Sequence, residues 1–291
     1  MLIGNESLDL RLTLMDSAQC FHWVEREGRF GAVVDGAPVW LWRDGAGIYV
    51  DGNCDPGLLR RYLDLDRDYA AVADEYAHIP AAREAVGLYP GLRVLNQPAW
   101  EALIAFILSA NNNVARIRSL VRALRENYGA RFEGGLYAFP TPQRLAACGE
   151  EELRALKVGY RAPFLIETAR RVRDGFPLEA LREMPYETAH KQLTTLPGVG
   201  DKVADCVLLF GCGHAEAFPV DVWVARLLRD WFGLACKSRS ALAKEARARL
   251  GGHAGLMQQF LFHAARVGGM EVGENSDLSG RHYVAAVPAP P

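Results

Sequence analysis

Lys202 and Asp221 are the residues of this chain whose types and spacing could do chemistry together. Lys202 follows the sequence LPGVGD at 196–201 and falls in the first turn of a predicted helix, where the positive end of the helix dipole disfavours a charged ammonium. A neutral amine is a nucleophile. Asp221 precedes a second amphipathic run, so its carboxylate is also expected at the start of a helix. Alone, each residue would be an ordinary solvated lysine or helix cap; together they predict an amine and a carboxylate in one site.

Gly198 and Gly200 lie in a tight turn between two segments of helical periodicity, 186–196 and 202–210. This is the pattern of a helix-hairpin-helix. Glycines in such a turn let backbone N–H groups approach a phosphate without a Cβ in the way, and the dipole of the second helix favours the anion. The hairpin therefore predicts contact with a nucleic-acid backbone, without recognition of base identity.

Two motifs carry a resemblance to a known family. The sequences LPGVGDKVADC at 196–206 and PVDVW at 219–223 resemble the 8-oxoguanine DNA glycosylase/AP lyase family of the helix-hairpin-helix-GPD superfamily. Lys202 matches the nucleophilic lysine of the bifunctional members, and Asp221 matches the catalytic aspartate. The resemblance implies a base-excision repair enzyme that removes 8-oxoguanine opposite cytosine from duplex DNA and then cleaves the strand by β-elimination.

The resemblance also implies a set of DNA contacts. Asn111 opens the run of three asparagines at 111–113 and matches the residue that enters the duplex where the damaged base has left. Arg116 and Arg161 match two arginines that hydrogen-bond the orphaned cytosine. Tyr160 matches the aromatic wedge that buckles the neighbouring stack.

Four residues match the family's pocket for the extruded base. Gln258 and Phe262 lie four residues apart in the last predicted helix, where the family uses a glutamine for the Watson–Crick edge and a phenylalanine to stack on the base. Cys206 would stack on the other face. Ala18 stands where the family has a glycine whose carbonyl accepts the N7 hydrogen of 8-oxoguanine, and this contact survives if the backbone φ angle of Ala18 is negative.

Other positions depart from the family pattern. Trp223 replaces a DNA-contacting histidine after the aspartate, and His263 and Ala265 replace the usual serine and aspartate of the last helix. We expect these changes to affect phosphate contacts and the rim of the pocket more than catalysis. His22 replaces an arginine and is expected at the surface or behind the site.

The charge distribution is consistent with a DNA-binding helical part. The 291-residue chain has a net charge of −2, which alone argues weakly against a nucleic-acid binder. Residues 1–95 contain nine basic and fifteen acidic residues, so the excess of positive charge lies in 96–291. Lysines are rare in this chain, with only five among the 33 basic residues, so chance alone would seldom place one in the hairpin.

The six cysteines include no C-x-x-C pair, so neither a zinc site nor a disulfide framework is expected. Some enzymes of the superfamily carry a four-cysteine iron–sulfur cluster after the catalytic aspartate, and here only Cys236 follows Asp221. We therefore expect no cofactor and no metal held by side chains. The resemblance leaves room for a monovalent ion at the backbone of the hairpin.

The apolar pattern predicts an α+β fold in two parts. Short alternating runs between 8 and 51, at 10–14, 21–23, 32–34, 39–41 and 48–50, predict an antiparallel sheet of four or five strands. Helical periodicity at 55–85, 99–109, 114–127 and beyond predicts a mostly α-helical, two-lobed glycosylase domain. We expect the sheet domain with its trailing helices at 1–95, the helical domain at 96–275 and a flexible tail at 276–291.

Damaged double-stranded DNA is the expected partner, and no segment has the length and apolar character of a membrane span. The first residues lack the pattern of a signal peptide, so we expect a cytoplasmic protein, associated with the nucleoid if it is bacterial. We also expect the protein to be a monomer. Two alternatives remain open: a related glycosylase for other damaged purines, or a non-catalytic helix-hairpin-helix DNA-binding protein. The pairing of Lys202 with Asp221 argues against the second, because phosphate binding by hairpin amides needs neither.

Overall fold

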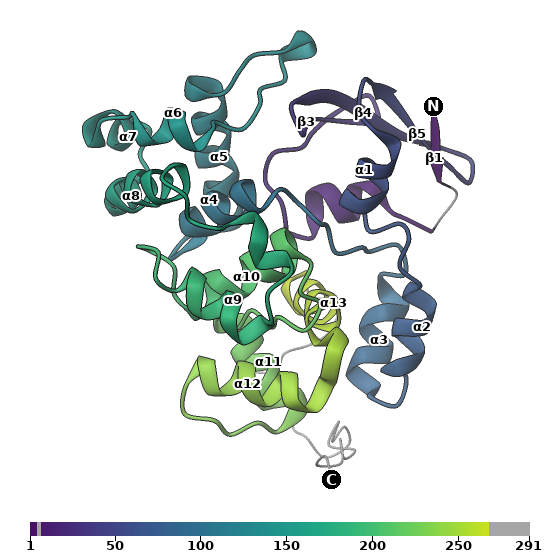
Figure 1. Ribbon diagram of the computed structural model, residues 1–291. Helices are drawn as coiled ribbons and strands as arrows, with labels where there is room; N and C mark the ends of the chain where they lie inside the picture. The colour runs from purple at the N-terminus through teal and green to yellow at the C-terminus, as the bar shows by residue number, and fades with distance from the viewer. Residues whose placement is uncertain (5–6, 268–291) are drawn as a thin grey trace.

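The computed structural model describes residues 1–4 and 7–267, which form a small sheet beside a larger set of helices (Figure 1). Five antiparallel strands follow the order β1-β5-β4-β3-β2. Their bounds are β1 (Leu2–Gly4), β2 (Val24–Arg26), β3 (Arg29–Val34), β4 (Ala37–Asp44) and β5 (Gly47–Gly52). The predicted α+β class and the antiparallel sheet are confirmed.

Two-residue turns join β2, β3 and β4, which are neighbours in this sheet. Glu27 (φ 50°) and Gly28 (φ 75°) connect β2 to β3, and Asp35 (φ 50°) and Gly36 (φ 74°) connect β3 to β4. Two consecutive residues with positive φ are typical of type I′ turns, whose twist matches that of antiparallel strands. These residue pairs therefore fix the register of the strands on either side.

The strands differ from the prediction at the N-terminal end. Leu12–Asp16 forms a π-helical turn (η1), so the strand predicted at 10–14 is wrong, and β2 begins just after the predicted 21–23. Leu10 and Leu14 are four residues apart and both are buried, so the same leucines form one face of a helical turn. The edge strand β1 is not among the predicted strands.

The apolar core of the sheet domain lies between the sheet and two short helical segments, η1 and α1 (Pro56–Tyr62). Leu41 and Ile48 of the sheet share one buried cluster with Leu14 and Leu59 of these segments. At its edge Trp23 donates through Nε1 to the hydroxyl of Tyr62 at 2.9 Å. The first element after the sheet is thereby fixed to it.

The remaining helices form the larger part of the molecule. Helix α3 packs against α13 and α2 packs against α3, so the two trailing helices adjoin the helical part rather than the sheet. The predicted helices at 99–109 and 114–127 are confirmed. The bounds are α2 (Tyr69–Glu75), α3 (Pro80–Leu88), α4 (Ala99–Ser109), α5 (Val114–Tyr128), η2 (Glu133–Gly135), α6 (Pro142–Ala146), α7 (Glu150–Ala155), η3 (Gly159–Arg161), α8 (Ala162–Arg173), η4 (Glu179–Arg182), α9 (Tyr186–Leu193), α10 (Asp201–Cys212), α11 (Val222–Phe232), α12 (Arg239–Leu250), η5 (Gly251–His253) and α13 (Ala254–Arg266).

Two groups of helices, α5–α8 and α9–α13, lie on either side of α4 in Figure 1, as expected for a two-lobed domain. The boundaries proposed at 95 and 275 stay predictions. The tail predicted at 276–291 lies outside the described residues.

Helix α4 is buried over nearly its whole length, and α10 crosses it at close range. A Cβ on Gly211 would lie 2.9 Å from the Cβ of Ala102 and 3.2 Å from the Cα of Ala99, so only glycine allows this approach. Further along the contact Phe106 stacks on Phe210 with ring centroids 5.4 Å apart. The end of α4 thereby meets the beginning of α10.

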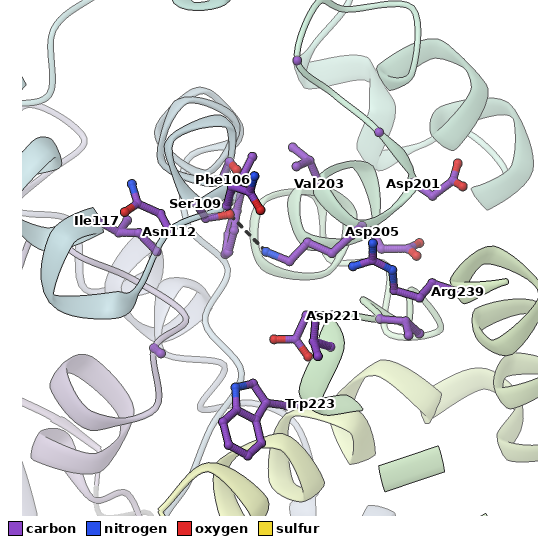
Figure 2. Close-up of a pocket in the computed structure, with 18 of the residues that line it drawn as sticks. Phe106, Ser109, Asn112, Ile117, Asp201, Val203, Asp205, Asp221, Trp223 and Arg239 are labelled. Carbon is purple, nitrogen blue, oxygen red and sulfur yellow. Dashed lines mark hydrogen bonds between the residues drawn. The ribbon is translucent and has the colours of Figure 1, made fainter. Parts of the chain in front are cut away.

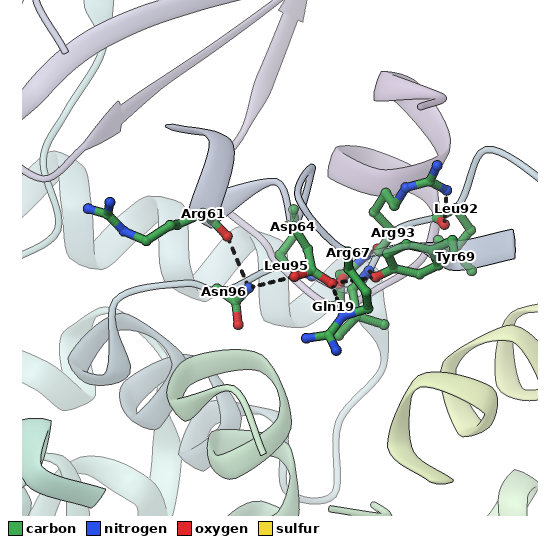
Figure 3. A network of polar contacts seen from close by, with 10 residues as sticks. Gln19, Arg61, Asp64, Arg67, Tyr69, Leu92, Arg93, Leu95 and Asn96 are labelled. Atoms are coloured by element: carbon green, nitrogen blue, oxygen red, sulfur yellow. Dashed lines mark hydrogen bonds and ion pairs between the residues drawn. The ribbon is translucent and has the colours of Figure 1, made fainter. Parts of the chain in front are cut away.

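A polar network holds the segment that leads into α4 (Figure 3). The side chain of Gln19 is fully buried, and its Nε2 donates to the carbonyls of Thr13 (3.1 Å) and Arg93 (2.8 Å). Its Oε1 accepts from the backbone N–H of Leu95 (2.8 Å), and Gln97 donates to its main-chain carbonyl (2.7 Å). One side chain therefore satisfies several buried backbone groups of both parts of the molecule.

The same segment is bound a second time by Tyr69. The hydroxyl of Tyr69 accepts from the backbone N–H of Val94 (2.8 Å) and donates to Asp64 (2.9 Å). Asn96 completes the contact by donating to the carbonyl of Arg61 (3.0 Å). Buried backbone groups need such partners, so the path from the sheet domain into α4 is closely fixed.

We predict that Gln19→Leu lowers the free energy of unfolding by about 3 kcal/mol or more, because it removes the acceptor of the buried N–H of Leu95 and a donor from the buried carbonyls of Thr13 and Arg93. Urea denaturation followed by circular dichroism measures this. Gln143→Leu on α6 is the matched control, because Gln143 is exposed and its replacement should change stability by less than about 0.5 kcal/mol. Equal urea midpoints for the two variants would refute the role of the network.

Candidate active site

A pocket of about 850 Å³ opens between the two lobes, beside the end of α4. Its walls come from the loop after α4, the hairpin before α10, the beginning of α11 and residues 18–21 of the sheet domain, with further contributions from α12 and α13. Most of the predicted site residues line it together: Ala18, Asn111, Tyr160, Gly198, Gly200, Lys202, Asp221, Trp223 and Phe262.

The amine of Lys202 is held against the end of α4. Its Nζ donates to Ser109 Oγ at 3.0 Å and lies 5.1 Å from the centre of the Phe106 ring. The hydroxyl of Ser109 donates its own proton to the carbonyl of Phe106 (2.7 Å), so its oxygen is free to accept from the lysine. Lys202 stands in the first turn of α10, as predicted from the sequence.

Asp221 is the N-cap of α11, and its Oδ1 accepts from the backbone N–H of Val224 at 2.8 Å. The prediction of a carboxylate at a helix entrance is confirmed. Figure 2 shows the carboxylate directed into the pocket between Ser109 and Trp223.

The two hairpin glycines have different roles. Gly198 has φ 78°, and a Cβ there would lie 2.8 Å from the ring of Phe164, so both the backbone conformation and the packing require glycine. Gly200 is the N-cap of α10, and no atom lies within 4 Å of the place where its Cβ would be. Nothing therefore crowds the beginning of α10 at this position, and the phosphate contact predicted for its first N–H groups stays a prediction.

The three asparagines after α4 are not equivalent. Asn112 Nδ2 donates to the carbonyl of Leu108 (3.1 Å), and Asn113 is the N-cap of α5, accepting from the N–H of Arg116 (2.9 Å). Asn111 is exposed, has φ 54°, and its side chain makes no hydrogen bond within the described chain. Asparagine tolerates this left-handed conformation better than most residues. Of the three, Asn111 alone offers an unengaged amide to a ligand.

The loop with Tyr160 lies against the asparagine loop. Tyr160 is 50% exposed, whereas Arg161 is buried. Arg161 Nε donates to the carbonyl of Ala110 (3.1 Å), and its guanidinium also bonds the carbonyl of Asn111 (3.3 Å). Arg116 donates to the carbonyl of Lys157 (2.8 Å) in the same region. Both arginines therefore support these loops here, and the cytosine contacts implied for them stay predictions.

The residues predicted for base binding fall into two groups. Ala18 and Phe262 line the pocket, whereas Cys206 and Gln258 are buried and do not. Burial raises the pKa of the Cys206 thiol to about 11, so the thiol stays neutral. Gln258 Nε2 donates to the carbonyl of Pro219 (3.2 Å), but its Oε1 is a buried acceptor with no partner in the part of the chain that the structure describes.

Ala18 has φ 59°, so the negative φ on which its predicted carbonyl contact depended is absent. An alanine here adopts a backbone conformation that favours glycine, at a cost of about 1–2 kcal/mol. Hydrogen bonds of the preceding residue, Ser17, hold this segment in place. Gln259 of α13 donates to the carbonyl of Ser17 (2.8 Å), and the Ser17 hydroxyl donates to the carbonyl of Thr13 (2.9 Å).

His22 is buried beneath the sheet domain, so the surface position considered for it is wrong. Its Nε2 lies 3.2 Å from the hydroxyl of Tyr62, and its Nδ1 lies 3.8 Å from a carboxyl oxygen of Glu101 on α4. Burial lowers the pKa of His22 to about 3 and raises that of Glu101 to about 7. These long-range partners, not visible in the local sequence, decide its position.

Three charged residues line the pocket without having been predicted. Arg239, the first residue of α12, directs its guanidinium into the pocket (Figure 2), and it has no hydrogen bond or ion pair within the described chain. Asp201, by contrast, accepts a hydrogen bond from the hydroxyl of Ser240. Asp205 is buried and accepts from Tyr186 (2.6 Å), and burial raises its pKa to about 6. The sequence gives no signal for which residue of a basic helix faces the site.

Within residues 1–4 and 7–267, no cluster of His, Cys, Asp and Glu side chains is arranged to bind a metal, and every cysteine is a free thiol. The helices of the same residues are all too short or too polar to span a membrane. An ion at the hairpin backbone stays a prediction.

Comparison with known proteins identifies the family. Residues 104–251 match the model of the HhH-GPD superfamily base excision DNA repair proteins. The chain belongs to this superfamily. Residues 1–103 match a second model, that of the N-terminal domain of 8-oxoguanine DNA glycosylases. Together the two models cover both the sheet domain and the lobes around the pocket.

Several relatives agree with this assignment. The N-glycosylase/DNA lyase of Saccharomyces cerevisiae is 37% identical over 188 residues, which cover 59% of this chain and 50% of that protein. A probable N-glycosylase/DNA lyase of Methanothermobacter thermautotrophicus is 33% identical over 203 residues, with 62% and 65% covered. The chain thus spans between half and two thirds of the length of these curated relatives.

Solved structures match over most of their length. The apo form of the Clostridium acetobutylicum 8-oxoguanine glycosylase/lyase superposes with a TM-score of 0.83 at 30% identity, covering 89% of this chain and 93% of that one. The same enzyme with double-stranded DNA containing cytosine opposite 8-oxoguanine gives 0.85 at 29% identity, covering 91% and 94%. The fold described above is therefore that of these glycosylases.

We predict that Ala18→Gly raises the free energy of unfolding by about 1 kcal/mol, because it removes the strain of the positive φ. Thermal and urea denaturation measure the change. Ala115→Gly at an exposed position of α5 is the control and should lower stability by about 1 kcal/mol, as expected inside a helix. Destabilisation by both substitutions would show that Ala18 is not strained.

Proposed function

We propose that this chain is a base-excision repair DNA glycosylase that removes 8-oxoguanine opposite cytosine from duplex DNA and cleaves the strand as an AP lyase. The observation that carries the proposal is the position of Lys202. Its amine lies in a pocket that also contains the Asp221 carboxylate and opens beside the hairpin and Asn111. A module that only binds DNA has no need of this amine and carboxylate.

The base must leave the stack before a side chain can reach its sugar, so extrusion of the nucleotide comes first. Lys202 then attacks C1′ of the deoxyribose while the C1′–N9 bond breaks, and the base leaves with the bonding electrons. Asp221 stabilises the positive charge that develops on the sugar. The amine then loses a proton, and the sugar ring opens as the C1′–O4′ bond breaks and O4′ takes up a proton, which gives a Schiff base between Lys202 and C1′. β-Elimination removes a C2′ proton and breaks the C3′–O bond, so the 3′ phosphate leaves.

Recognition of the base is assigned to α13 and the segment around Ala18. The unpaired Oε1 of Gln258 would gain a donor from the Watson–Crick edge of a guanine, which offers N–H groups there. Phe262 provides an aromatic wall for stacking. On the DNA side, Asn111 and Tyr160 are the exposed groups next to the pocket and are proposed to fill the gap left in the duplex.

The proposed enzyme works on damaged double-stranded DNA as a monomer and without an iron–sulfur cluster. The absence of four cysteines after Asp221 supports the last point, since Cys236 alone follows it in the sequence. A cytoplasmic location, with the nucleoid as its site of action if the source is bacterial, completes the proposal. The alternative substrate class, other damaged purines, is separated by a panel of lesion duplexes.

We predict that borohydride traps the native chain covalently on a duplex with 8-oxoguanine opposite cytosine, and that Lys202→Gln abolishes the adduct because it removes the amine. Denaturing gel electrophoresis measures the trapped fraction. Lys191→Gln is the matched control, because Lys191 is exposed on α9 of the same hairpin and does not line the pocket. Base release without trapping would indicate a monofunctional glycosylase; neither release nor trapping on any lesion duplex would favour the binding protein.

We predict that Asp221→Asn lowers the single-turnover rate of base release by about a hundredfold, because the charge that stabilises the sugar is lost. Asparagine is as good an N-cap as aspartate, so stability should change by less than about 0.5 kcal/mol and lesion binding should be largely kept. Asp230→Asn on the exposed face of α11 controls for the loss of charge. Equal losses of rate and binding would leave Asp221 only a structural cap.

A further inference from the structure

A second pocket, of about 560 Å³, adjoins the candidate active site, and Val114 at the beginning of α5 lines both. Its walls are η1, the turn after α3, the first turns of α5 and the end of α13. The proposed reaction gives this pocket no role. Its charged side chains are those of Asp9, Arg11, Asp16, Arg118 and Arg266.

The acidic groups of the second pocket are already engaged. Asp9 accepts from a backbone N–H of η1 (2.9 Å), and Asp16 is paired with Arg11 (3.6 Å). Arg118 and Arg266 have no carboxylate within 4.0 Å in the described chain and donate only to backbone carbonyls of η1. Two guanidinium groups therefore face one cavity without a carboxylate at ion-pair distance among the described residues.

Two buried nitrogen atoms of this pocket also lack partners among the described residues. His263 is only 3% exposed, and neither its Nδ1 nor Nε of Arg266 makes a hydrogen bond there. A buried polar group without a partner is unfavourable, and a ligand with acceptor atoms would supply the partner. Burial and the charge of Arg266 lower the pKa of His263 to about 4. Burial and Arg118 lower the pKa of Arg266, whereas Asp16 raises it. Three arginines and two aspartates line the pocket, which leaves an excess of positive charge.

We propose that this second pocket binds the phosphate group of a nucleotide, with Arg118, Arg266 and His263 as its ligands. Guanidinium forks match the oxygens of a phosphate, and the imidazole adds a donor. The cavity is larger than a phosphate requires, and Leu88 and Tyr89 at its wall offer apolar contact to a sugar or base. The phosphate belongs either to the DNA strand in the neighbouring site or to a free nucleotide.

Isothermal titration calorimetry of the full chain with dGMP, without DNA, is the first test. We expect one binding event that Arg118→Gln and Arg266→Gln each weaken about tenfold, as for loss of a charge-assisted hydrogen bond. Arg122→Gln, one turn further along α5 and outside the pocket, should leave it unchanged. His263→Phe keeps the edge contact with the Tyr89 ring, 4.5 Å between centroids, and should weaken binding without unfolding the protein. Binding lost in Lys202→Gln but kept in Arg118→Gln would place dGMP in the active site and overturn the proposal.

The second test measures how the affinity for an undamaged duplex depends on salt concentration. If the DNA strand supplies the phosphate, Arg118→Gln should reduce the slope of log K against log salt by about one, and Arg122→Gln should not. An unchanged slope together with dGMP binding at the arginines assigns the site to a free nucleotide. An unchanged slope without dGMP binding overturns the proposal. Neither measurement uses base release, so failure here is distinct from failure of the proposed glycosylase.

Discussion

The close crossing of α4 and α10 is the contact on which the site depends. Gly211 removes the side chain that would push the helices apart at Ala99 and Ala102. Because the helices run in opposite directions, the same contact brings Lys202, at the beginning of α10, to Ser109, at the end of α4. The hairpin precedes α10 and the asparagine loop follows α4. Both loops that are proposed to contact DNA are therefore attached to the ends of one packed helix pair, and a bulkier residue at 211 would displace them.

Local chemistry explains which parts of the fold and site could be predicted from the sequence. The hairpin, the N-cap at Asp221 and the helices around Asn111 follow from turn residues, caps and periodicity within a few positions. The leucines of η1 fit both a strand and a helical turn, so their state depends on packing against the sheet. For a similar reason the local sequence does not show that His22 is buried, that Arg161 binds loop carbonyls, or that Arg239 faces the pocket. Their positions are set by partners or surfaces far away in the chain.

The asparagine run shows how identical residues acquire different functions from backbone geometry. At the end of α4, Asn112 satisfies a carbonyl of the last turn, and Asn113 satisfies an N–H of the first turn of α5. Both ends of a helix have such unpaired groups, so the second and third asparagines are required by the junction itself. Asn111 is left at the apex with a positive φ and an exposed amide. Arg161 donates to the carbonyls of Ala110 and Asn111 at the same apex, so the backbone of the loop is fixed. The side chain of Asn111 stays free to contact a ligand.

The rim of the first pocket combines exposed apolar groups with a charged interior. Tyr160 is 50% exposed, Val222 65% and Trp223 48%, and all three line the pocket that contains Lys202 and Asp221. Large apolar side chains gathered at one opening indicate a surface that a ligand covers. The flat face of an unstacked base stacks well on such apolar side chains. The sugar of the same nucleotide is the part that needs the charged groups inside the pocket. In the proposed reaction, Trp223 would extend the stacking surface at a position where a histidine would supply mainly a polar contact. The pocket would then hold an extruded nucleotide through its faces as well as its edges.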